Sequence, residues 1–250
     1  MILRGLSLAK KSGDMPTFAD RREAGNVLAK QLRAYAGRRD VVVLGLAPGG
    51  VPVAAEVARE LDAPLDVLVV RTLALPGFDE LTLGAIGPAG VTLLDWGTVA
   101  RSGVTGSAVA TLLARERADL HRREMTYRGD APTLSLSERT VILVDDGLTS
   151  GAAMRAAISA ARGRHASRIV VAVPVCTHSA CTELLHEADE IEGALTPEPF
   201  DGVSPCYRDF KLPSDDEVRR LIRACSQRDL RYSARSDCSS DESPSESVAS

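Results

Sequence analysis

The chain has 250 residues, of which 44% are hydrophobic, enough for a substantial buried core, and its formal charge is −4. That charge gives no general attraction to nucleic acid or to an anionic membrane, so neither is an expected partner. No apolar run reaches the ~20 residues of a membrane helix, and the first 14 residues lack a secretory apolar core, which favours a cytoplasmic protein. The five cysteines lack paired spacing, which predicts reduced thiols rather than a disulfide framework or a zinc site.

The N-terminal part of the chain predicts a flexible extension over residues 1–16, ahead of a domain over 17–228. Apolar spacing then predicts a helix over 20–35 that begins at Asp20, where a carboxylate can cap the first turn. Three further elements follow, in the order strand, helix, strand: Val41 to Leu46, the segment through Leu61, and Leu65 to Val70. This order is a βαβ unit, which places its two strands in parallel.

Residues 72–128 predict a flap followed by a charged helix. The part from 72 to 95 is rich in Gly and Pro, so hairpins and a mobile flap both suit it. Residues 107–126 carry an apolar stripe with arginines from Arg115 to Arg123 beside it. A solvated face explains these arginines, and the alternative is that the helix folds over a site and supplies charge.

The C-terminal half predicts alternating strands and helices. Strands are expected at 141–144, at 168–173, where Pro174 ends the strand, and at 189–195. Helices are expected from Met154 onward, at 179–187 and from Ser214 through Ala224. The serine-rich acidic tail over 229–250 is expected to be disordered.

The most informative stretch places two carboxylates and a small polar loop between a buried strand and a helix. The first N–H groups of a helix lack internal partners and carry the positive end of its dipole, so a phosphate fits there. Asp145 and Asp146 would repel a phosphate but suit ribose hydroxyls or magnesium. A sugar phosphate is therefore the predicted ligand, and the alternative is that the aspartates only cap the helix.

This stretch resembles the phosphoribosyl pyrophosphate (PRPP) motif of type I phosphoribosyltransferases, which has a hydrophobic strand, two acids, Gly and a Thr/Ser-Gly loop. The resemblance extends from Phe18 to Phe210 and is strongest to the uncharacterised bacterial "predicted phosphoribosyltransferase" group. It implies an α/β fold with a parallel, Rossmann-like sheet, a flap, and a hood formed by 196–212. It also implies PRPP and a small acceptor as partners, Mg²⁺ as cofactor, and a homodimer as a further expectation.

By this resemblance, Asp145 and Asp146 would bind the ribose hydroxyls, stabilise positive charge on the sugar, and meet Mg²⁺ indirectly through PRPP. The 5-phosphate would be held by Gly147, Leu148, Thr149, Ser150 and Gly151. The pyrophosphate would be held by Ala47, Pro48, Gly49, Gly50 and Arg71. A simple tight turn is the alternative for the first four of these. The acceptor hood would contain Phe200, Tyr207 and Phe210, which could instead anchor the C-terminal segment on the sheet.

Three positions depart from the pattern of this group. Pro48 stands where its members have Arg, Thr72 where they have Lys, and Ala153 where the motif often has Thr or Ser. The lost cations matter most, because charge-assisted hydrogen bonds are about twice as strong as neutral ones.

The leading prediction is a phosphoribosyltransferase that joins PRPP to a small nitrogenous acceptor such as a nucleobase and releases pyrophosphate. The alternative is a non-catalytic PRPP or nucleotide sensor with a degenerate pyrophosphate site. A phosphoryl receiver is a third interpretation, and the Thr149-Ser150-Gly151 loop directly after the acids disfavours it.

Overall fold

The computed structural model describes residues 2–4, 7–9, 17–75, 78–129 and 131–236, with side chains over 17–74, 82–129 and 131–225. Its centre is a seven-stranded parallel sheet in the order β1-β10-β9-β8-β3-β4, with β2 also paired to β10. These strands are Ile2–Arg4 (β1), Ser7–Ala9 (β2), Val41–Ala47 (β3), Leu65–Val69 (β4), Thr140–Val144 (β8), Arg168–Val175 (β9) and Glu190–Pro197 (β10). The predicted parallel α/β sheet is confirmed.

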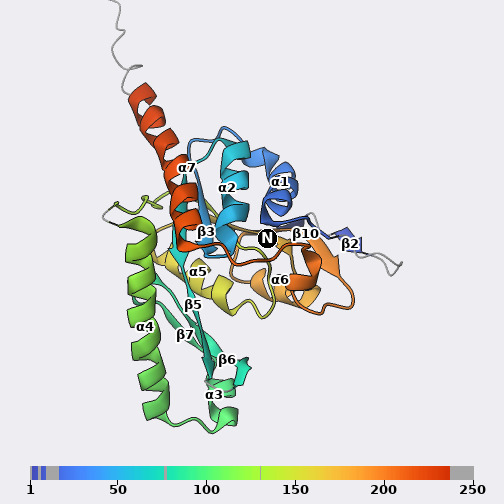
Figure 1. Cartoon of the computed structure of the whole chain (residues 1–250), viewed down its shortest axis with the longest axis vertical. Coiled ribbons are helices and arrows are strands. Elements are labelled where there is room, and N and C mark those ends of the chain that lie inside the picture. The colour runs from blue at the N-terminus through green and yellow to red at the C-terminus, as the bar shows by residue number, and fades with distance from the viewer. Residues whose placement is uncertain (1, 5–6, 10–16, 76–77, 130, 237–250) are drawn as a thin grey trace, which may run out of the picture.

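Helices cover both faces of this sheet (Figure 1). On one face lie α1 (Arg21–Gln31), α2 (Gly50–Leu61) and α7 (Asp215–Ser236), and on the other lie α5 (Ala152–Gly163) and α6 (His178–Leu184). The central strands are buried along nearly their whole length because each side is covered, which explains their continuous runs of Val, Ile and Leu. None of the described helices combines the length and apolar character needed to cross a membrane.

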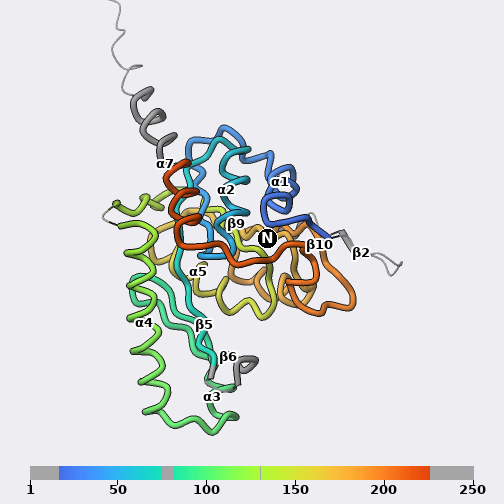
Figure 2. Tube along the Cα trace, viewed as in Figure 1, coloured from blue at the N-terminus to red at the C-terminus, as the bar shows by residue number. Residues whose placement is uncertain are grey.

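A second, smaller lobe extends away from the main sheet (Figures 1 and 2). It contains an antiparallel sheet of β5 (Arg71–Leu75), β6 (Phe78–Ile86) and β7 (Thr92–Leu94), so the hairpin interpretation of this region describes its backbone. Two helices complete the lobe, α3 (Trp96–Ser102) and α4 (Gly106–Arg128). The sequence analysis did not predict α3, which begins where the Asp95 side chain accepts a hydrogen bond from the Thr98 backbone N–H.

Besides α3 and shifts of a few residues at helix ends, the observed elements differ from the predicted ones at β9, at the N-terminal extension and at the C-terminal tail. β9 continues through Pro174. Its pairing with β8 ends at Ala172, so no carbonyl of β8 needs the backbone N–H that proline lacks. β1 and β2 lie within the predicted flexible extension and pair with the otherwise open edge of β10. α7 reaches Ser236, inside the predicted tail, because 225–236 contains no Gly or Pro. Residues 237–250 of that tail lie outside the described residues.

Candidate functional site

Two loops meet at the carboxyl edge of the parallel sheet, where the neighbouring strands β3 and β8 end. A Cβ atom built on Gly49 would lie 2.3 Å from Asp146 Oδ2, and one built on Gly50 would lie 2.5 Å from the Val144 carbonyl oxygen. The loop before α2 therefore lies directly against the two acids. The carboxyl edge of such a sheet is the usual ligand side, and here it combines backbone amides with two carboxylates.

The two carboxylates are half-buried, and the Asp146 side chain is 16% exposed. Asp145 Oδ1 accepts a hydrogen bond of 2.9 Å from the backbone N–H of Asp146. Burial raises the pKa of Asp145 well above its usual range, and the neighbouring Asp146 carboxylate raises it further. Burial also raises the pKa of Asp146, while the guanidinium of Arg21 opposes that rise. Such a pair favours a ligand that brings hydroxyl donors or positive charge to it.

A divalent cation here would need ligands beyond the protein. Among the side chains that the structure describes, no cluster of three or more His, Cys, Asp or Glu could hold a metal ion. Asp145 and Asp146 supply hard oxygen donors of the kind Mg²⁺ prefers, and Mg²⁺ commonly binds through one or two carboxylates together with substrate phosphates. The acid pair therefore fits a cation that arrives with a phosphorylated ligand.

Arg21 is the site residue that sequence analysis missed. It begins α1, and Asp20 caps that helix by accepting hydrogen bonds from the backbone N–H groups of Arg22 and Glu23. The Arg21 guanidinium is buried and donates through Nε to Asp146 Oδ2 at 2.8 Å. The only signal in the sequence was that Arg21 lies within the region of family resemblance, which begins at Phe18. No spacing rule links two residues that are 125 positions apart.

The loop from Gly147 to Gly151 leads into α5. Leu148 is buried and its N–H donates to the Val175 carbonyl at 2.8 Å, which fixes the loop beside β9, while Thr149 and Ser150 are exposed. Gly151 has a φ of 73°, which favours glycine, and it caps α5 without a side-chain hydrogen bond. The first N–H groups of α5 thus have no side-chain cap, as a phosphate site requires.

Arg71 lies at the start of β5, and its described contacts are with α4. Its Nε donates to Glu116 Oε2 at 2.9 Å, and its NH2 group lies 3.3 Å from Asp119 Oδ2. A pyrophosphate ligand would have to compete with these two carboxylates for the guanidinium. The predicted pyrophosphate role of Arg71 stays a prediction.

Two of the three predicted hood aromatics, Tyr207 and Phe210, lie near the acid pair or its partner Arg21. The Tyr207 hydroxyl donates to the Asp146 carbonyl at 2.6 Å, and the ring centroids of Tyr207 and Phe210 lie 4.9 Å apart. Burial raises the pKa of the Tyr207 phenol, so it stays a hydrogen-bond donor. Phe200 packs against an apolar cluster that contains Phe18 and Tyr207. Tyr207 and Phe210 therefore border the acid pair, and all three rings help to anchor the C-terminal segment.

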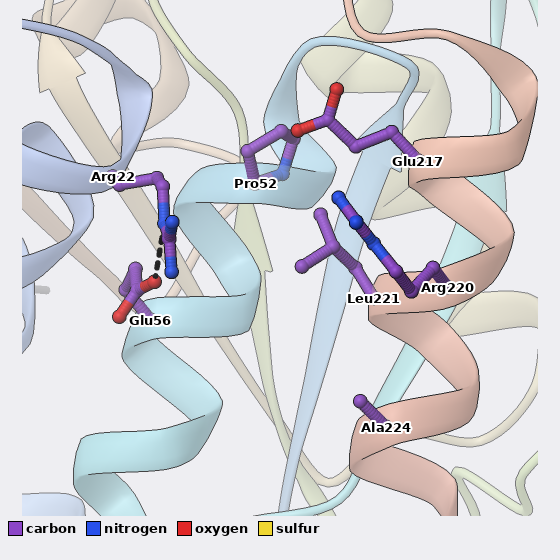
Figure 3. A pocket seen from close by; sticks show the side chains of 7 residues that line it. All are labelled: Arg22, Pro52, Glu56, Glu217, Arg220, Leu221 and Ala224. Atoms are coloured by element: carbon purple, nitrogen blue, oxygen red, sulfur yellow. Dashed lines mark hydrogen bonds and ion pairs between the residues drawn. The ribbon is translucent and has the colours of Figure 1, made fainter.

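Two surface hollows lie outside this edge of the sheet. One, of about 300 Å³, lies between α2 and α7 and is lined by Pro52, Glu56 and Arg220, among others (Figure 3). The other, of about 400 Å³, lies beside β4 and the C-terminal half of α4. None of the predicted site residues lines either hollow.

Comparisons of sequence and structure identify proteins that are similar to this chain. The family profile described as "Phosphoribosyl transferase domain" matches residues 20–197. "Putative phosphoribosyl transferase Rv0571c" of Mycobacterium tuberculosis is 41% identical over 204 residues, which cover 82% of this chain and 46% of that protein. The chain thus spans about half the length of this curated relative. The crystal structure of TT1426 from Thermus thermophilus is similar at 38% identity and a TM-score of 0.70, covering 84% of this chain and 99% of that one.

Proposed function

This chain belongs to the phosphoribosyl transferase domain family, and we propose that it transfers the phosphoribosyl group of PRPP to a small nitrogenous acceptor such as a nucleobase. Pyrophosphate is the leaving group in this proposal, and Mg²⁺ accompanies PRPP. The observation that carries the proposal is the contact between the acids and the loop before α2, where Gly49 leaves room for the Asp146 carboxylate. This contact supports the proposal because the two acids, which would bind the ribose, lie beside backbone amides that could bind a pyrophosphate.

In the proposed reaction, the bond between the anomeric carbon and pyrophosphate breaks while a bond to the acceptor nitrogen forms, and the proton that this nitrogen carried leaves to the departing pyrophosphate or to water. Asp145 and Asp146 would accept hydrogen bonds from the ribose 2- and 3-hydroxyls. In their ionised form, the two carboxylates would also stabilise positive charge that develops on the sugar ring. Because the pair is half-buried, each such interaction is stronger than it would be in water.

The remaining groups of PRPP would be held by the backbone. Amides of Gly147 to Gly151 and the uncapped start of α5 would bind the 5-phosphate, with hydroxyl donors from Thr149 and Ser150. Amides of Gly49 and Gly50 would face the pyrophosphate. The chemistry that Mg²⁺ supplies when bound is neutralisation of charge on this leaving group.

The proposal is tested by calorimetric titration with PRPP and Mg²⁺, together with pyrophosphate release across a panel of nucleobases. We expect binding and release with at least one base, and loss of both when Asp145→Asn and Asp146→Asn are combined. A control variant combines Glu183→Gln with Glu187→Gln, two surface acids that pair with Arg155. Normal turnover by the aspartate double variant would refute the assignment.

A second candidate function is a PRPP or nucleotide sensor without turnover. It is favoured by the absence of cations at Pro48 and Thr72, and by the engagement of Arg71 with Glu116 and Asp119. This candidate predicts that PRPP binds while no acceptor in the panel leads to pyrophosphate release. Release with any acceptor would eliminate it.

A further inference from the structure

We propose that Arg21 is a positioning residue that fixes the Asp146 side chain and couples it to the C-terminal segment 207–211. Arg21 would thereby hold the acid pair and the hood as one unit. The link to PRPP rests on the function proposed above, whereas the coupling itself rests only on the contacts of Arg21.

The guanidinium of Arg21 is engaged on several sides at once. Its side chain is 6% exposed, and its Nε and NH2 groups lie 2.8 and 2.7 Å from the same oxygen, Asp146 Oδ2. Its NH1 group donates to the Lys211 carbonyl at 2.8 Å, and its central carbon lies 3.9 Å from the centroid of the Phe210 ring. A planar guanidinium can make these contacts together, whereas a lysine ammonium cannot reproduce the fork.

Asp146 is confined from two directions. Gly49 approaches its carboxylate so closely that a Cβ atom there would lie 2.3 Å from Oδ2. Arg21 binds that same oxygen, so the second carboxylate oxygen is not engaged by Arg21. The side chain is therefore held between the loop before α2 and the start of α1. Arg21 also brings one positive charge near the loop whose position 48 lacks the Arg of related sequences.

The C-terminal segment has its own attachment beside Arg21. The backbone N–H groups of Arg208 and Asp209 donate to the carbonyls of Phe18 and Ala19, at 2.8 and 2.9 Å. Removal of the Arg21 guanidinium should therefore leave the segment attached at this point. The part that should loosen is Phe210 and Lys211, because Arg21 joins the Lys211 carbonyl to Asp146 and stacks on Phe210, which then keeps only its ring contact with Tyr207.

Hydrogen exchange of the peptide covering 209–212 tests the coupling directly. We expect exchange in this peptide to become at least about tenfold faster in Arg21→Gln, because a hydrogen bond with a charged donor stabilises more than a neutral one. Arg21→Lys keeps a charge near Asp146 and is the variant to use if Arg21→Gln fails to fold. The matched control is Arg22→Gln, since Arg22 is 66% exposed and pairs with Glu56 on α2 (Figure 3). It should leave the exchange unchanged.

A double-mutant cycle with Asp146→Asn asks whether Arg21 acts through this carboxylate. We expect Arg21→Lys and Asp146→Asn each to accelerate exchange in 209–212, because either change breaks the forked contact, and the double variant to add little. Unchanged exchange in both Arg21 variants, or full additivity in the double variant, would overturn the proposal. A general loss of structure would instead accelerate exchange throughout the sheet.

The functional consequence is measured separately by titration with PRPP and Mg²⁺. We expect Arg21→Lys to weaken PRPP affinity about tenfold, since it removes a charge-assisted bond that orients Asp146, while Arg22→Gln has no effect. If the unmodified protein does not bind PRPP, the proposed function fails, and the exchange experiments alone then decide the positioning role. If it binds and Arg21→Lys binds equally well, orientation by Arg21 is wrong.

Discussion

At the scale of single residues, Gly50 shows how closely the site is assembled. A Cβ atom at this position would lie 2.5 Å from the Val144 carbonyl oxygen and 2.8 Å from the Asp145 Cα atom. Both neighbours belong to the backbone of β8 and its following loop, so neither can rotate away as a flexible side chain would. A residue with a Cβ at position 50 must therefore separate the loop before α2 from the acid pair.

We accordingly expect Gly50→Ala to lower the free energy of unfolding by about 1–3 kcal/mol, the usual cost of overpacking, and to weaken PRPP binding. Gly106→Ala is the control, because Gly106 begins α4 and a Cβ there would meet nothing within 4 Å. That variant should be neutral or more stable by up to about 1 kcal/mol, since alanine favours helix. Urea unfolding measures both, and equal stability of the two variants would contradict the close approach.

Residues of the site could be predicted from sequence where the pattern that marks them is local. Asp145 and Asp146 follow a strand of four apolar residues directly, so their place at its end needed only the neighbouring letters. Arg21 reaches Asp146 across 125 positions, and only the packing of α1 against the sheet brings the two together. Similarly, Arg71 has the residue type expected of a phosphate ligand, but α4 supplies Glu116 as a competing partner that no local pattern revealed.

At the scale of elements, the lobe of β5, β6 and β7 determines which cations can serve the site. Arg71 and Thr72 begin β5 directly after β4 ends at the ligand edge of the main sheet. Arg71 is already paired with α4, whereas Thr72 is exposed. A cation placed at position 72 would therefore add charge to this strand without displacing a buried partner.

We expect Thr72→Lys to raise the affinity for pyrophosphate with Mg²⁺ about tenfold, because charge-assisted hydrogen bonds contribute about 1.5–3 kcal/mol. Thr111→Lys adds the same charge to an exposed position of α4 in the same lobe and should have a smaller effect. Calorimetry at two ionic strengths measures both, since a general charge effect is screened by salt. Equal affinities in the two variants would show that the missing lysine does not explain a weak pyrophosphate site.

Helices and strands could be predicted where a clear apolar pattern marks them in the sequence. They could be predicted less well where tertiary contacts determine their ends. β3 and β8 contain β-branched and leucine-rich runs, which are typical of a strand covered on both faces. α3 has seven residues and one capping signal at Asp95, too little for a periodic pattern. The end of β9 depended on where β8 stops pairing, so Pro174 alone gave the wrong boundary.

At the scale of the whole molecule, the two helical layers position the loops at the carboxyl edge of the main sheet. A bound ligand would then connect these loops. α1 and α2 on one face and α5 on the other begin beside the loops that follow β3 and β8. Two carboxylates meet there, and one buried arginine lies between Asp146 and the backbone of Lys211. A phosphorylated sugar would connect the start of α5 to the loop before α2, so binding should stabilise the chain as a unit.

Magnesium and PRPP should therefore stabilise the protein together, and magnesium alone should not. At a PRPP concentration 100 times its Kd, linkage adds about 2.7 kcal/mol to the free energy of unfolding, which raises the Tm by several degrees. Mg²⁺ without PRPP should shift the Tm little, because the described residues offer only the acid pair and no cluster of three metal-ligating side chains. Thermal unfolding with each component, with both, and with both plus a chelator measures this. A large shift with Mg²⁺ alone would mean that the protein holds a complete metal site of its own, and a shift with PRPP that survives the chelator would mean that the acid pair tolerates the ligand without a cation.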